Sequence, residues 1–357
     1  MTSNGKRKLE HLLLASQPTA IGKISAGWDD VHLVPCALPE ISMSDVDLTT
    51  KFLNTSLNFP IMIAGMTGGC ELGGQVNRNL AIAAQEAGIA MGVGSQREAL
   101  ENSDFVETFA IARREAPDAF LVSNIGITQI PGVSESSLKL DQIRYAIDMI
   151  EANAIAVHLN FIQESIQPEG DRRFKHGFES LAAFVEQIGV PVITKETGCG
   201  VVRKTAEKLV QCGVAAIDVG GAGGTSFSAI ETMRAANSGH STSERMGIAF
   251  ANWGASTAAS TWECTNLNIP VIATGGLRNG HDTLKAICLG ASLAGFGRIM
   301  LEPAKQSADA VLTTVTEIAE QLRMGCFLMD ARTPIAARKN PAVLTGFLKD
   351  WIDQRKA

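Results

Sequence analysis

The sequence lacks the features that mark several classes of protein. It has no long cluster of lysine or arginine and a formal net charge of −6, which argues against a general nucleic-acid-binding surface but leaves room for one bound anion. Its seven cysteines show no CxxC or CxxH spacing, which fits reduced thiols better than disulfides or zinc ligation. No segment approaches the roughly 20 apolar residues of a membrane span, and the apolar run Leu12–Leu14 is too short for a signal peptide. We therefore expect a cytoplasmic protein.

The sequence does contain enough apolar residues for a large core. With 45% hydrophobic and 19% charged residues, the chain of 357 residues has the composition of a globular enzyme. The length alone would allow two domains. Because (β/α)8 barrels commonly exceed about 250 residues as one unit, the number of domains has to be judged from the repeat pattern.

One pattern recurs along most of the chain: a short apolar run, then glycine or polar residues, then a segment with helical periodicity. The predicted strands are 61–64, 89–93, 120–124, 154–160, 191–196, 215–220, 270–274 and 292–297. Between them the apolar spacing is helical, as in Val76, Leu80, Ala84 and Ala87. Apolar strands covered by helices are typical of a parallel sheet buried on both faces. Eight such units without a break in composition favour an α/β fold closed as a (β/α)8 TIM barrel, and an open doubly wound sheet is the alternative.

Two stretches depart from this repeat. Residues 1–59 precede the first strand, and we predict an N-terminal arm that packs on or over the barrel mouth, leaving 60–357 as the barrel. Residues 226–268 exceed one crossover helix and contain a polar run, so we predict a long loop after strand 6 at the active-site face. Near the carboxyl end, a helix that follows Pro303 is predicted to end with Gly325 as its C-cap.

The seventh predicted strand ends in two glycines and the eighth in Ala294-Gly295. In barrels a phosphate sits most often on the loops after these two strands and on a nearby helix amino terminus. Gly275 and Gly276 would let backbone N–H groups approach an oxyanion, and Gly295 would do the same beside them. Either loop alone is compatible with a simple tight turn, but the two together predict a phosphate site. The glycine-rich segment 220–225 suits a flat or charged ligand and is a weak indicator by itself.

Lys195 lies at the end of the fifth predicted strand, where a buried ammonium is costly without an anionic partner. We expect it to face charge that develops on a cofactor or substrate. A pair with Glu196 on the barrel rim is the alternative, which is disfavoured because adjacent strand residues point to opposite faces.

A polar cluster follows the fourth predicted strand. His158 and Asn160 share one face of the strand, and the next turn brings Gln163 and Glu164 to the same mouth. One carboxylate is a poor zinc site but a reasonable Mg²⁺ site, because Mg²⁺ typically takes one or two carboxylates and completes its shell with water and phosphates. His158 alone would more often be a core histidine, and its neighbours favour a functional role.

Positive charge and a hydroxyl group come from two further places. Ser95 and Arg97 follow the second predicted strand, and Arg7 and Lys8 lie near the start of the chain. Together they offer what a diphosphate requires. Taken alone, Arg7 and Lys8 fit a solvated terminus, so their role depends on whether the N-terminal arm reaches the barrel mouth.

Together these segments resemble the type 2 (FMN-dependent) isopentenyl diphosphate isomerases over nearly the whole chain. The similar motifs are Arg-Lys-Leu-Glu-His at 7–11, Met-Thr-Gly-Gly at 66–69, Gly-Ser-Gln-Arg at 94–97, His-Leu-Asn-Phe-Ile-Gln-Glu at 158–164, Gln-Pro-Glu-Gly-Asp at 167–171, Lys-Glu-Thr-Gly-Cys-Gly at 195–200, Asp-Val-Gly-Gly-Ala-Gly-Gly-Thr at 218–225 and Gly-Gly-Leu-Arg-Asn-Gly at 275–280. The His-x-Asn-x-x-Gln-Glu run is the most specific of them, whereas Gly-Gly-x-Arg is shared with other flavin barrels.

The resemblance implies a role for each strand end. The residues that would hold the isoalloxazine and ribityl chain of FMN are Met66, Thr67, Gly68, Ser95, Asn124, Lys195 and Thr225. Those that would hold the FMN phosphate are Gly276, Leu277, Arg278, Ala294 and Gly295. The substrate would be bound by Arg7, Lys8, Ser95, Gln96, Arg97 and Gln163. Glu164 would bind Mg²⁺, and the catalytic residues would be His158, Asn160, Gln163 and Lys195.

The implied reaction is the isomerisation of isopentenyl diphosphate to dimethylallyl diphosphate, with NADPH as the reductant of FMN, in a homo-oligomeric enzyme (tetramer or octamer). An FMN-dependent hydroxyacid oxidase or dehydrogenase is the alternative, because Lys195 and the Gly-Gly-x-Arg loop would look alike there. Such an enzyme needs a histidine base beside the flavin and an arginine for the substrate carboxylate. A catalytically silent flavin-binding protein would have no need of Gln163 and Glu164. This pair favours the diphosphate enzyme.

Overall fold

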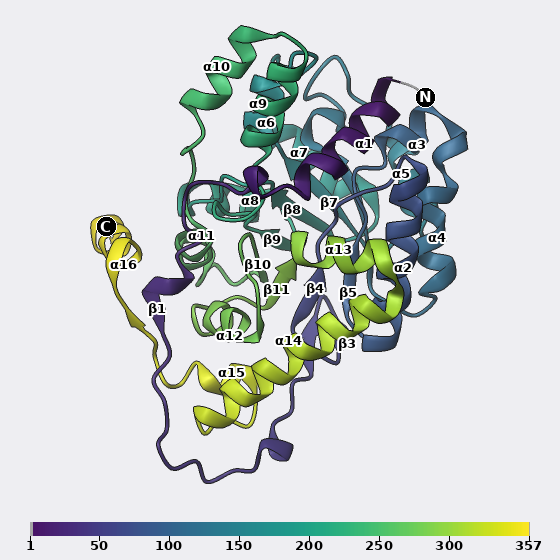
Figure 1. Cartoon of the computed structure of the whole chain (residues 1–357). Helices are drawn as coiled ribbons and strands as arrows, with labels where there is room; N and C mark the ends of the chain where they lie inside the picture. The colour runs from purple at the N-terminus through teal and green to yellow at the C-terminus, as the bar shows by residue number, and fades with distance from the viewer. Residues whose placement is uncertain (1–2, 357) are drawn as a thin grey trace.

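Eight parallel strands form a closed barrel at the centre of the molecule (Figure 1). The computed structural model describes residues 3–356, with side chains from residue 8 onward. The barrel strands are β4 (Ile61–Ile63), β5 (Ala90–Gly92), β6 (Leu121–Gly126), β7 (Ala154–Leu159), β8 (Val192–Glu196), β9 (Ala216–Asp218), β10 (Val271–Thr274) and β11 (Leu293–Phe296). They close in the order β10-β11-β4-β5-β6-β7-β8-β9. The predicted (β/α)8 barrel is confirmed, and the open sheet is excluded.

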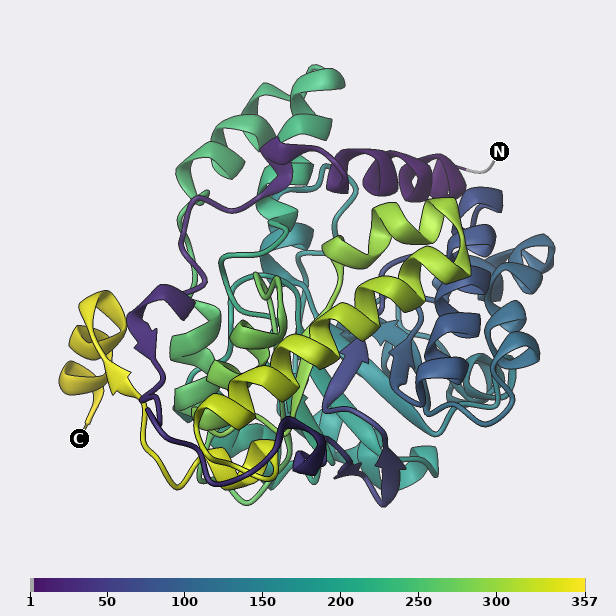
Figure 2. The same ribbon diagram turned by 60° about the horizontal axis from the view of Figure 1, so that its bottom comes forward.

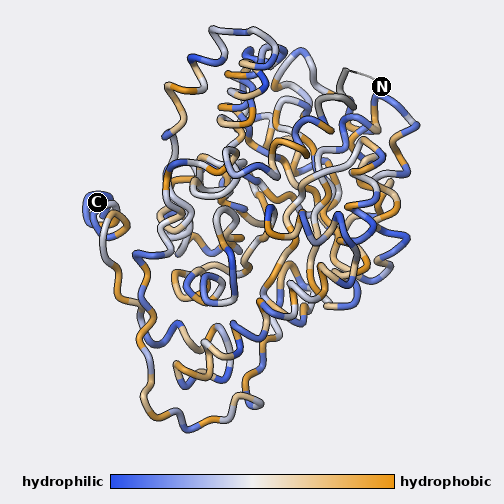
Figure 3. Tube along the Cα trace, in the orientation of Figure 1, coloured by the Kyte–Doolittle hydropathy of each residue, from blue (hydrophilic) through white to orange (hydrophobic). Residues whose placement is uncertain are grey.

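Helices connect the successive barrel strands, and the last four, α13 to α16, follow the last barrel strand, β11. They are α2 (Glu71–Ala87), α3 (Arg97–Glu101), α4 (Glu107–Glu115), α5 (Leu140–Asp148), α6 (Phe161–Ile166), α7 (Gly177–Ile188), α8 (Arg203–Gln211), α9 (Phe227–Asn237), α10 (Ser241–Ala249), α11 (Thr257–Cys264), α12 (Gly280–Cys288), α13 (Arg298–Gln306), α14 (Ala308–Leu328), α15 (Pro334–Ala337) and α16 (Gly346–Arg355). Hydrophobic and hydrophilic residues interleave along most of these helices, as expected for segments with one buried side (Figure 3). No helix of the described chain is long and apolar enough to cross a membrane.

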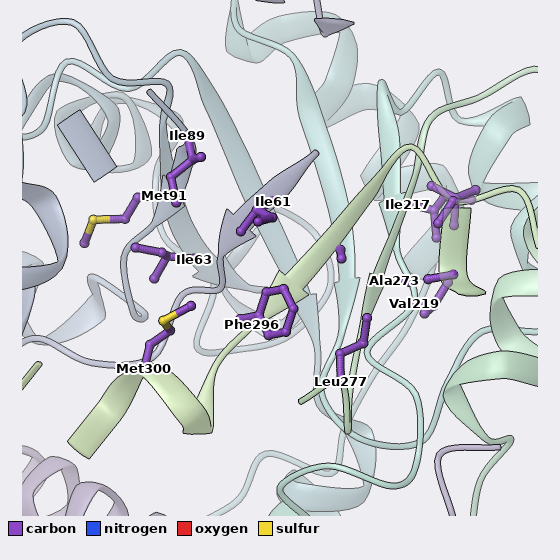
Figure 4. Packing of buried hydrophobic residues seen from close by; sticks show 14 of the residues in the cluster. Ile61, Ile63, Ile89, Met91, Ile217, Val219, Ala273, Leu277, Phe296 and Met300 are labelled. Atoms are coloured by element: carbon purple, nitrogen blue, oxygen red, sulfur yellow. The ribbon is translucent and has the colours of Figure 1, made fainter. Parts of the chain in front are cut away.

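Successive strand residues point alternately outward to the helices and inward to the barrel axis. Outward residues such as Ile61, Ile63, Met91 and Phe296 belong to one large core cluster between strands and helices (Figure 4). The inward residues form a separate cluster that includes Met62, Ala90, Val122, Ala154, Ala156, Ile193, Ala216, Ile272 and Leu293. The amino-terminal part of the barrel interior is therefore a packed core and not a channel.

The segment before β4 contacts both ends of the barrel. The strands β2 (Thr50–Phe52) and β3 (Thr55–Leu57) form a hairpin whose Phe52 and Leu57 join the inward cluster. The ring of Phe52 packs edge to face on Phe120, with centroids 5.7 Å apart, so the hairpin closes the amino-terminal end. At the opposite end, α1 (Ser3–Ala15) lies across the top of the barrel in the view of Figure 2. Between them, β1 (Val31–His32) pairs with β12 (Val343–Leu344) of the carboxyl-terminal segment.

The predicted long loop at 226–268 is wrong, because the segment folds into the three helices α9, α10 and α11. Serine caps begin two of them: Oγ of Ser226 accepts from the N–H of Ala229, and Oγ of Ser256 accepts from the N–H of Ala259, both at 3.2 Å. The polar run that suggested a loop is the short turn between α9 and α10 together with the exposed start of α10.

The predicted C-cap at Gly325 is also wrong, because α14 continues from Ala308 to Leu328 and contains this glycine. Packing explains its position. A Cβ on Gly325 would lie 2.7 Å from Cδ2 of Leu284 on α12, so the glycine allows α12 and α14 to approach closely.

We expect Gly280→Ala, at the first residue of α12, to destabilise the fold. The added Cβ would lie 2.2 Å from the carbonyl oxygen of Ile318 and 2.4 Å from the nitrogen of Leu322, both in the backbone of α14. Because neither atom can turn away, the two helices would have to separate, and the free energy of unfolding should fall by about 1–3 kcal/mol in urea denaturation. The matched control is Gly177→Ala at the first residue of α7, where a Cβ meets nothing within 4 Å. Equal stability of the two variants would contradict the tight approach of α12 and α14.

Candidate active site

A row of polar side chains crosses four neighbouring strands at the carboxyl end of the barrel interior. The strand register pairs Gly126 with His158, His158 with Lys195, and Lys195 with Asp218. These positions continue the inward set, because residues two apart in a strand point to the same side. Asn124, two residues before Gly126, lies on that side as well. The inward face thus changes from apolar to polar where the strands end, which is where barrel enzymes carry their chemistry.

Lys195 is bound to a buried carboxylate. Its Nζ donates to Oδ2 of Asp218 at 2.7 Å, and only 12% and 3% of the two side chains are exposed. Oδ1 of Asp218 accepts from the N–H of Gly220 at 3.2 Å. Lys195 therefore faces inward with an anionic partner that we did not predict.

Glu196 points to the other side of the strand, as expected for the next residue. Its Oε2 accepts from the N–H groups of Gly198 and Gly200, at 2.7 and 3.0 Å, and also from that of Cys199. Burial raises the pKa of Glu196 to about 7, although these backbone donors act to lower it. Glu196 thus organises the loop after β8, and the alternative pairing with Lys195 is not formed.

The imidazole of His158 is held by an amide whose orientation is fixed. Nδ2 of Asn124 donates to the carbonyl of Val93 at 3.0 Å, which turns Oδ1 of Asn124 toward Nδ1 of His158, 2.8 Å away. The proton of the neutral ring therefore lies on Nδ1. Burial, and then the positive charges of Lys8 and Lys195, lower the pKa of His158 to about 3. The ring is neutral at physiological pH and can accept a hydrogen bond at Nε2.

A small hollow lies inside the barrel beside this row. Small residues, including Gly92 and Ala156, leave this space, and the polar residues in its wall are Asn124, Lys195 and Asp218. A hollow that is mostly apolar with a few convergent polar groups suits the polar edge of a flat ligand.

A second polar cluster begins where β7 ends. Nδ2 of Asn160 donates to Oε1 of Glu164 at 2.9 Å and to Oε1 of Gln163 at 3.3 Å. Oε2 of Glu164 accepts from the N–H of Asp171 at 2.9 Å. Within residues 8–356, Oδ1 of Asn160 is buried without a hydrogen-bond partner, and no cluster of three or more histidine, cysteine or acidic side chains could hold a metal ion. A cation at Glu164 would therefore need water or substrate oxygens as further ligands.

Gln163 also contacts a buried carboxylate that we did not predict. Its Nε2 donates to Oε1 of Glu231 at 3.1 Å, and Nε2 of His11 lies 2.8 Å from the same oxygen. Nη1 of Arg234 donates to Oε2 of Glu231 at 2.6 Å. Burial acts to raise the pKa of Glu231, but the hydrogen bond from His11 and the charge of Arg234 bring it below its usual value. Glu231 was missed because it lies on α9, where we expected a loop; the serine cap at Ser226 was the available signal.

The start of the chain reaches the barrel mouth through Lys8. Its Nζ donates to the carbonyl oxygen of Ser95 at 2.9 Å. Arg97 begins α3 and pairs with Glu101 at 2.6 Å, with 33% of its side chain exposed. The side chain of Arg7 lies outside the described part of the structure, so its contact with a substrate stays a prediction.

Gln96 is placed differently from the prediction. It is fully buried, and its Nε2 donates to the carbonyl of Ala146 at 2.7 Å. Its Oε1 accepts from Oγ of Ser123 at 2.5 Å and from the N–H of Asn124 at 3.0 Å. These bonds tie α5 and β6 to the loop after β5. The side chain of Gln96 is thus engaged within the fold, and its contact with a substrate stays a prediction.

The predicted phosphate loop after β10 has the backbone that only glycine adopts easily. Gly275 and Gly276 have φ angles of 125° and 71°. A Cβ on Gly276 would lie 2.6 Å from the carbonyl oxygen of Gly223 in the neighbouring glycine-rich loop. Oγ1 of Thr274, the last residue of β10, is buried without a hydrogen-bond partner among the described residues. An unpartnered hydroxyl donor next to a glycine loop is the kind of group that binds a phosphate oxygen.

The other predicted phosphate residues lie beside this loop. Leu277 is buried in the large core cluster, so only its backbone can face a ligand, whereas the side chain of Arg278 is exposed. Ala294 and Gly295 lie inside β11 rather than after it, because the strand continues to Phe296 before α13 begins. Gly295 pairs with Thr274 in the strand register, which places it against the unpartnered hydroxyl.

The remaining predicted residues lie on the same rim. Thr67 and Gly68 are buried, and Met66 is half-buried. The carbonyl of Thr67 accepts from the N–H of Gly94 at 2.9 Å, which joins the ends of β4 and β5. Thr225 lines a second hollow beside the glycine-rich loop after β9.

Comparison with known proteins begins with the fold. Residues 141–329 match the family model described as FMN-dependent dehydrogenase. Among solved structures, one described as a lactate oxidase of Pediococcus acidilactici superposes with a TM-score of 0.69 at 16% identity, covering 97% of this chain and 94% of that one. A mandelate oxidase variant superposes with a TM-score of 0.61 at 19% identity, covering 95% and 98%. At these identities the likeness shows the fold alone. Barrel and site together define the class of FMN-dependent (β/α)8 barrels.

Curated relatives narrow this class. The chain is 42% identical to the isopentenyl-diphosphate delta-isomerase of Methanothermobacter thermautotrophicus, over 98% of this chain and 96% of the relative. It is 42% identical to that of Pyrococcus abyssi, over 98% and 95%, and 40% identical to that of Methanosarcina mazei, over 99% and 96%. The chain belongs to the isopentenyl-diphosphate delta-isomerase family.

His158 makes a testable contribution to stability against pH. Its pKa is about 3 in the fold, below the usual 6.5, so the unfolded chain binds a proton between these values and the folded chain does not. The stabilisation is present above pH 6.5 and is lost as the pH falls through that range. Between pH 7.5 and pH 5 the wild type should lose about 2 kcal/mol more free energy of unfolding than His158→Gln, measured by urea denaturation without ligands.

The control for this measurement is His240→Gln, at an exposed position. It should keep the pH dependence of the wild type. A His158→Gln variant with that same dependence would show that the ring protonates equally well in the fold and in the unfolded chain.

Proposed function

We propose that this protein converts isopentenyl diphosphate to dimethylallyl diphosphate by a 1,3-allylic proton transfer, with reduced FMN and Mg²⁺, in isoprenoid biosynthesis. The observation that carries the proposal is the identity of 40–42% to isomerases over at least 98% of the chain. NADPH as the reductant of FMN, a cytoplasmic location and a homo-oligomer, tetramer or octamer, are further parts of the proposal.

The residues present fit FMN at the carboxyl end of the barrel. The phosphate would be held by the backbone of Gly276 and Leu277 and by Arg278, beside the unpartnered hydroxyl of Thr274. Ala294 and Gly295 would border it on β11. The isoalloxazine and ribityl chain would contact Met66, Thr67, Gly68, Ser95, Asn124, Lys195 and Thr225. Reduced FMN would supply the groups that exchange protons with the two allylic carbons.

The diphosphate would bind beside this ring. Lys8 and Arg97 supply positive charge near Ser95, and Arg7 precedes Lys8 by one residue. Neutral His158 would offer Nε2 as an acceptor to a protonated diphosphate oxygen. Ammonium and guanidinium groups are the usual partners of phosphate oxygens.

The cluster after β7 would hold the metal and orient the substrate. Glu164 would coordinate Mg²⁺ together with diphosphate oxygens and water, which suits the single carboxylate available there. Asn160 positions Glu164, at 2.9 Å, and Gln163. Because Nε2 of Gln163 donates to Glu231, its Oε1 is turned toward Asn160, and the amide is preoriented to contact the bound diphosphate.

Lys195 and the apolar wall of the hollow would act on the ring itself. The ammonium provides positive charge where negative charge develops on the reduced flavin. The surrounding apolar side chains keep water from a carbocation-like centre, which water would otherwise trap.

An assay with each component omitted in turn tests this function. The purified protein is incubated anaerobically with isopentenyl diphosphate, FMN, NADPH and Mg²⁺. We expect dimethylallyl diphosphate to form in many turnovers without NADPH being consumed at each one. Stoichiometric oxidation of an added hydroxyacid would instead support the oxidase alternative. Bound flavin without either reaction would support a silent flavin-binding protein.

Glu164→Gln tests the metal assignment. Because the amide keeps the size but loses the charge, the Mg²⁺ concentration for half-maximal turnover should rise about tenfold or more. The variant should remain yellow, since Glu164 does not face the proposed flavin position. The control is Glu135→Gln, an exposed carboxylate paired with Arg173, which should behave as the wild type. Loss of flavin from Glu164→Gln would place this residue next to the cofactor.

A further inference from the structure

Asp218 is a buried carboxylate to which the proposed function gives no task. It lies at the end of β9, one strand from Lys195, and the strand register pairs the two residues directly. Burying two charges is costly unless geometry and further hydrogen bonds compensate. The free-energy cost of burying Lys195 and Asp218 is therefore not explained by packing alone, which suggests that the pair has a role in the site.

Both carboxylate oxygens of Asp218 are fixed. Oδ2 accepts from Nζ of Lys195 at 2.7 Å, and Oδ1 accepts from the backbone N–H of Gly220 at 3.2 Å. The N–H of Gly220 belongs to the first residue of the glycine-rich loop after β9, so the carboxylate is anchored to the backbone on one side. With 3% of its side chain exposed, Asp218 has little contact with water beyond these two partners. The position of the Lys195 charge is thus determined by Asp218.

The pair lines the hollow in the barrel interior together with Asn124. A ligand that enters this hollow meets the cation and the anion together. His158, the next residue in the polar row, is neutral and adds no compensating charge. The formal charge of the row is therefore zero and not +1.

We propose that Asp218 is a positioning residue for the flavin site: it fixes the Lys195 ammonium in the barrel interior and limits the positive charge that the ring meets. The inference rests on the proposed function only in that the ligand of the hollow is FMN. Two-electron reduction adds two electrons and one proton to the ring, so at pH 8 the reduced ring carries one more negative charge than the oxidised ring. The preference of the protein for reduced over oxidised FMN therefore reports the charge of the row.

Asp218→Asn removes one negative charge and nearly preserves shape. A unit charge some 10 Å away at an effective dielectric constant of about 20 changes the binding preference for an anion by roughly tenfold. We expect the ratio of the dissociation constants of reduced and oxidised FMN to fall about tenfold. That change raises the midpoint potential of a two-electron couple by about 30 mV.

The experiment measures the midpoint potential of the flavin-loaded protein by photoreduction at pH 8 against a reference dye, with FMN dissociation constants from fluorescence titration. Wild type, Asp218→Asn, Lys195→Met and the double variant form a cycle. A buried carboxylate that loses its cation takes up a proton rather than stay charged. Asp218→Asn should therefore change the ratio by less than about twofold in the Lys195→Met background. An equal change in both backgrounds would mean that the effect of Asp218 does not depend on the Lys195 ammonium, and the proposal would be wrong.

Glu263→Gln is the matched control for loss of a buried, cation-paired carboxylate. Glu263 is 2% exposed and pairs with Arg355 between α11 and α16, away from the barrel mouth. The Glu263→Gln substitution should lower the free energy of unfolding without changing the midpoint potential of the bound flavin. A potential of Asp218→Asn equal to those of the wild type and Glu263→Gln would overturn the proposal.

Two further outcomes are distinguishable. If Asp218→Asn fails to fold, the comparison of Lys195→Met with the double variant decides, because the double variant contains neither charge. A difference of fivefold or more between those two would contradict the positioning role. The flavin measurements use no isopentenyl diphosphate, so they do not depend on turnover. If the variants show the expected flavin ratios but the wild type forms no dimethylallyl diphosphate in the separate turnover assay, the proposed function is wrong and this inference still holds.

Discussion

Closure of a parallel barrel forces each strand to alternate between two environments, and the site depends on this constraint. Residues that point outward must meet helices, and residues that point inward must share one narrow interior. Val192 and Ile193 show the division, since the first belongs to the outer cluster and the second to the inner one. Continued to the end of β8, the same alternation turns Lys195 inward and Glu196 outward. The pattern that builds the core therefore also decides which side chains can meet a ligand.

The buried charges of the site are compensated in separate groups. Lys195 is matched by Asp218, and Glu231 is matched by Arg234 together with His11. Among the described residues Glu196 is matched by backbone N–H groups alone, which explains why burial still raises its pKa to about 7. Each group ties together different elements: two strands, a helix with the N-terminal arm, or one loop. The rim of the barrel is thus rigid where the ion pairs cross between elements.

Periodicity and composition were sufficient to predict the barrel, because apolar runs of strand length alternate with helical spacing eight times. They failed where local signals compete. The polar residues near Asn237 outweighed the serine caps at Ser226 and Ser256, although these caps begin helices. Glycine is the usual residue at a helix C-cap, which led to the wrong prediction at Gly325. A glycine is present there because a side chain would collide with Leu284, and this contact depends on tertiary packing.

The candidate site was predictable to the same extent. His158 and Lys195 follow from strand alternation, and the strand register pairs them as that argument requires. Asn160, which we expected on the same strand face as His158, lies one residue beyond β7 and precedes α6. Asp218 could not be recognised as the partner of Lys195, because the pairing depends on the register between two strands. Gln96 shows the opposite limit: its motif lies at the mouth, yet its side chain turns into the interior between α5 and β6. A motif fixes where the backbone passes, whereas the rotamer depends on the neighbours.

The pairing of β1 with β12 joins the two ends of the chain outside the barrel. Asp30 strengthens this link, since its carbonyl oxygen accepts from the N–H of Thr345 at 2.9 Å and its Oδ2 from the N–H of Leu348 at 3.0 Å. The arm that brings Lys8 to Ser95 is therefore anchored by the last turns of the polypeptide. A truncation or an affinity tag that disturbs α16 would weaken this link, although it lies far from the candidate active site. The N-terminal arm would then hold Lys8 less firmly at the entrance of the barrel.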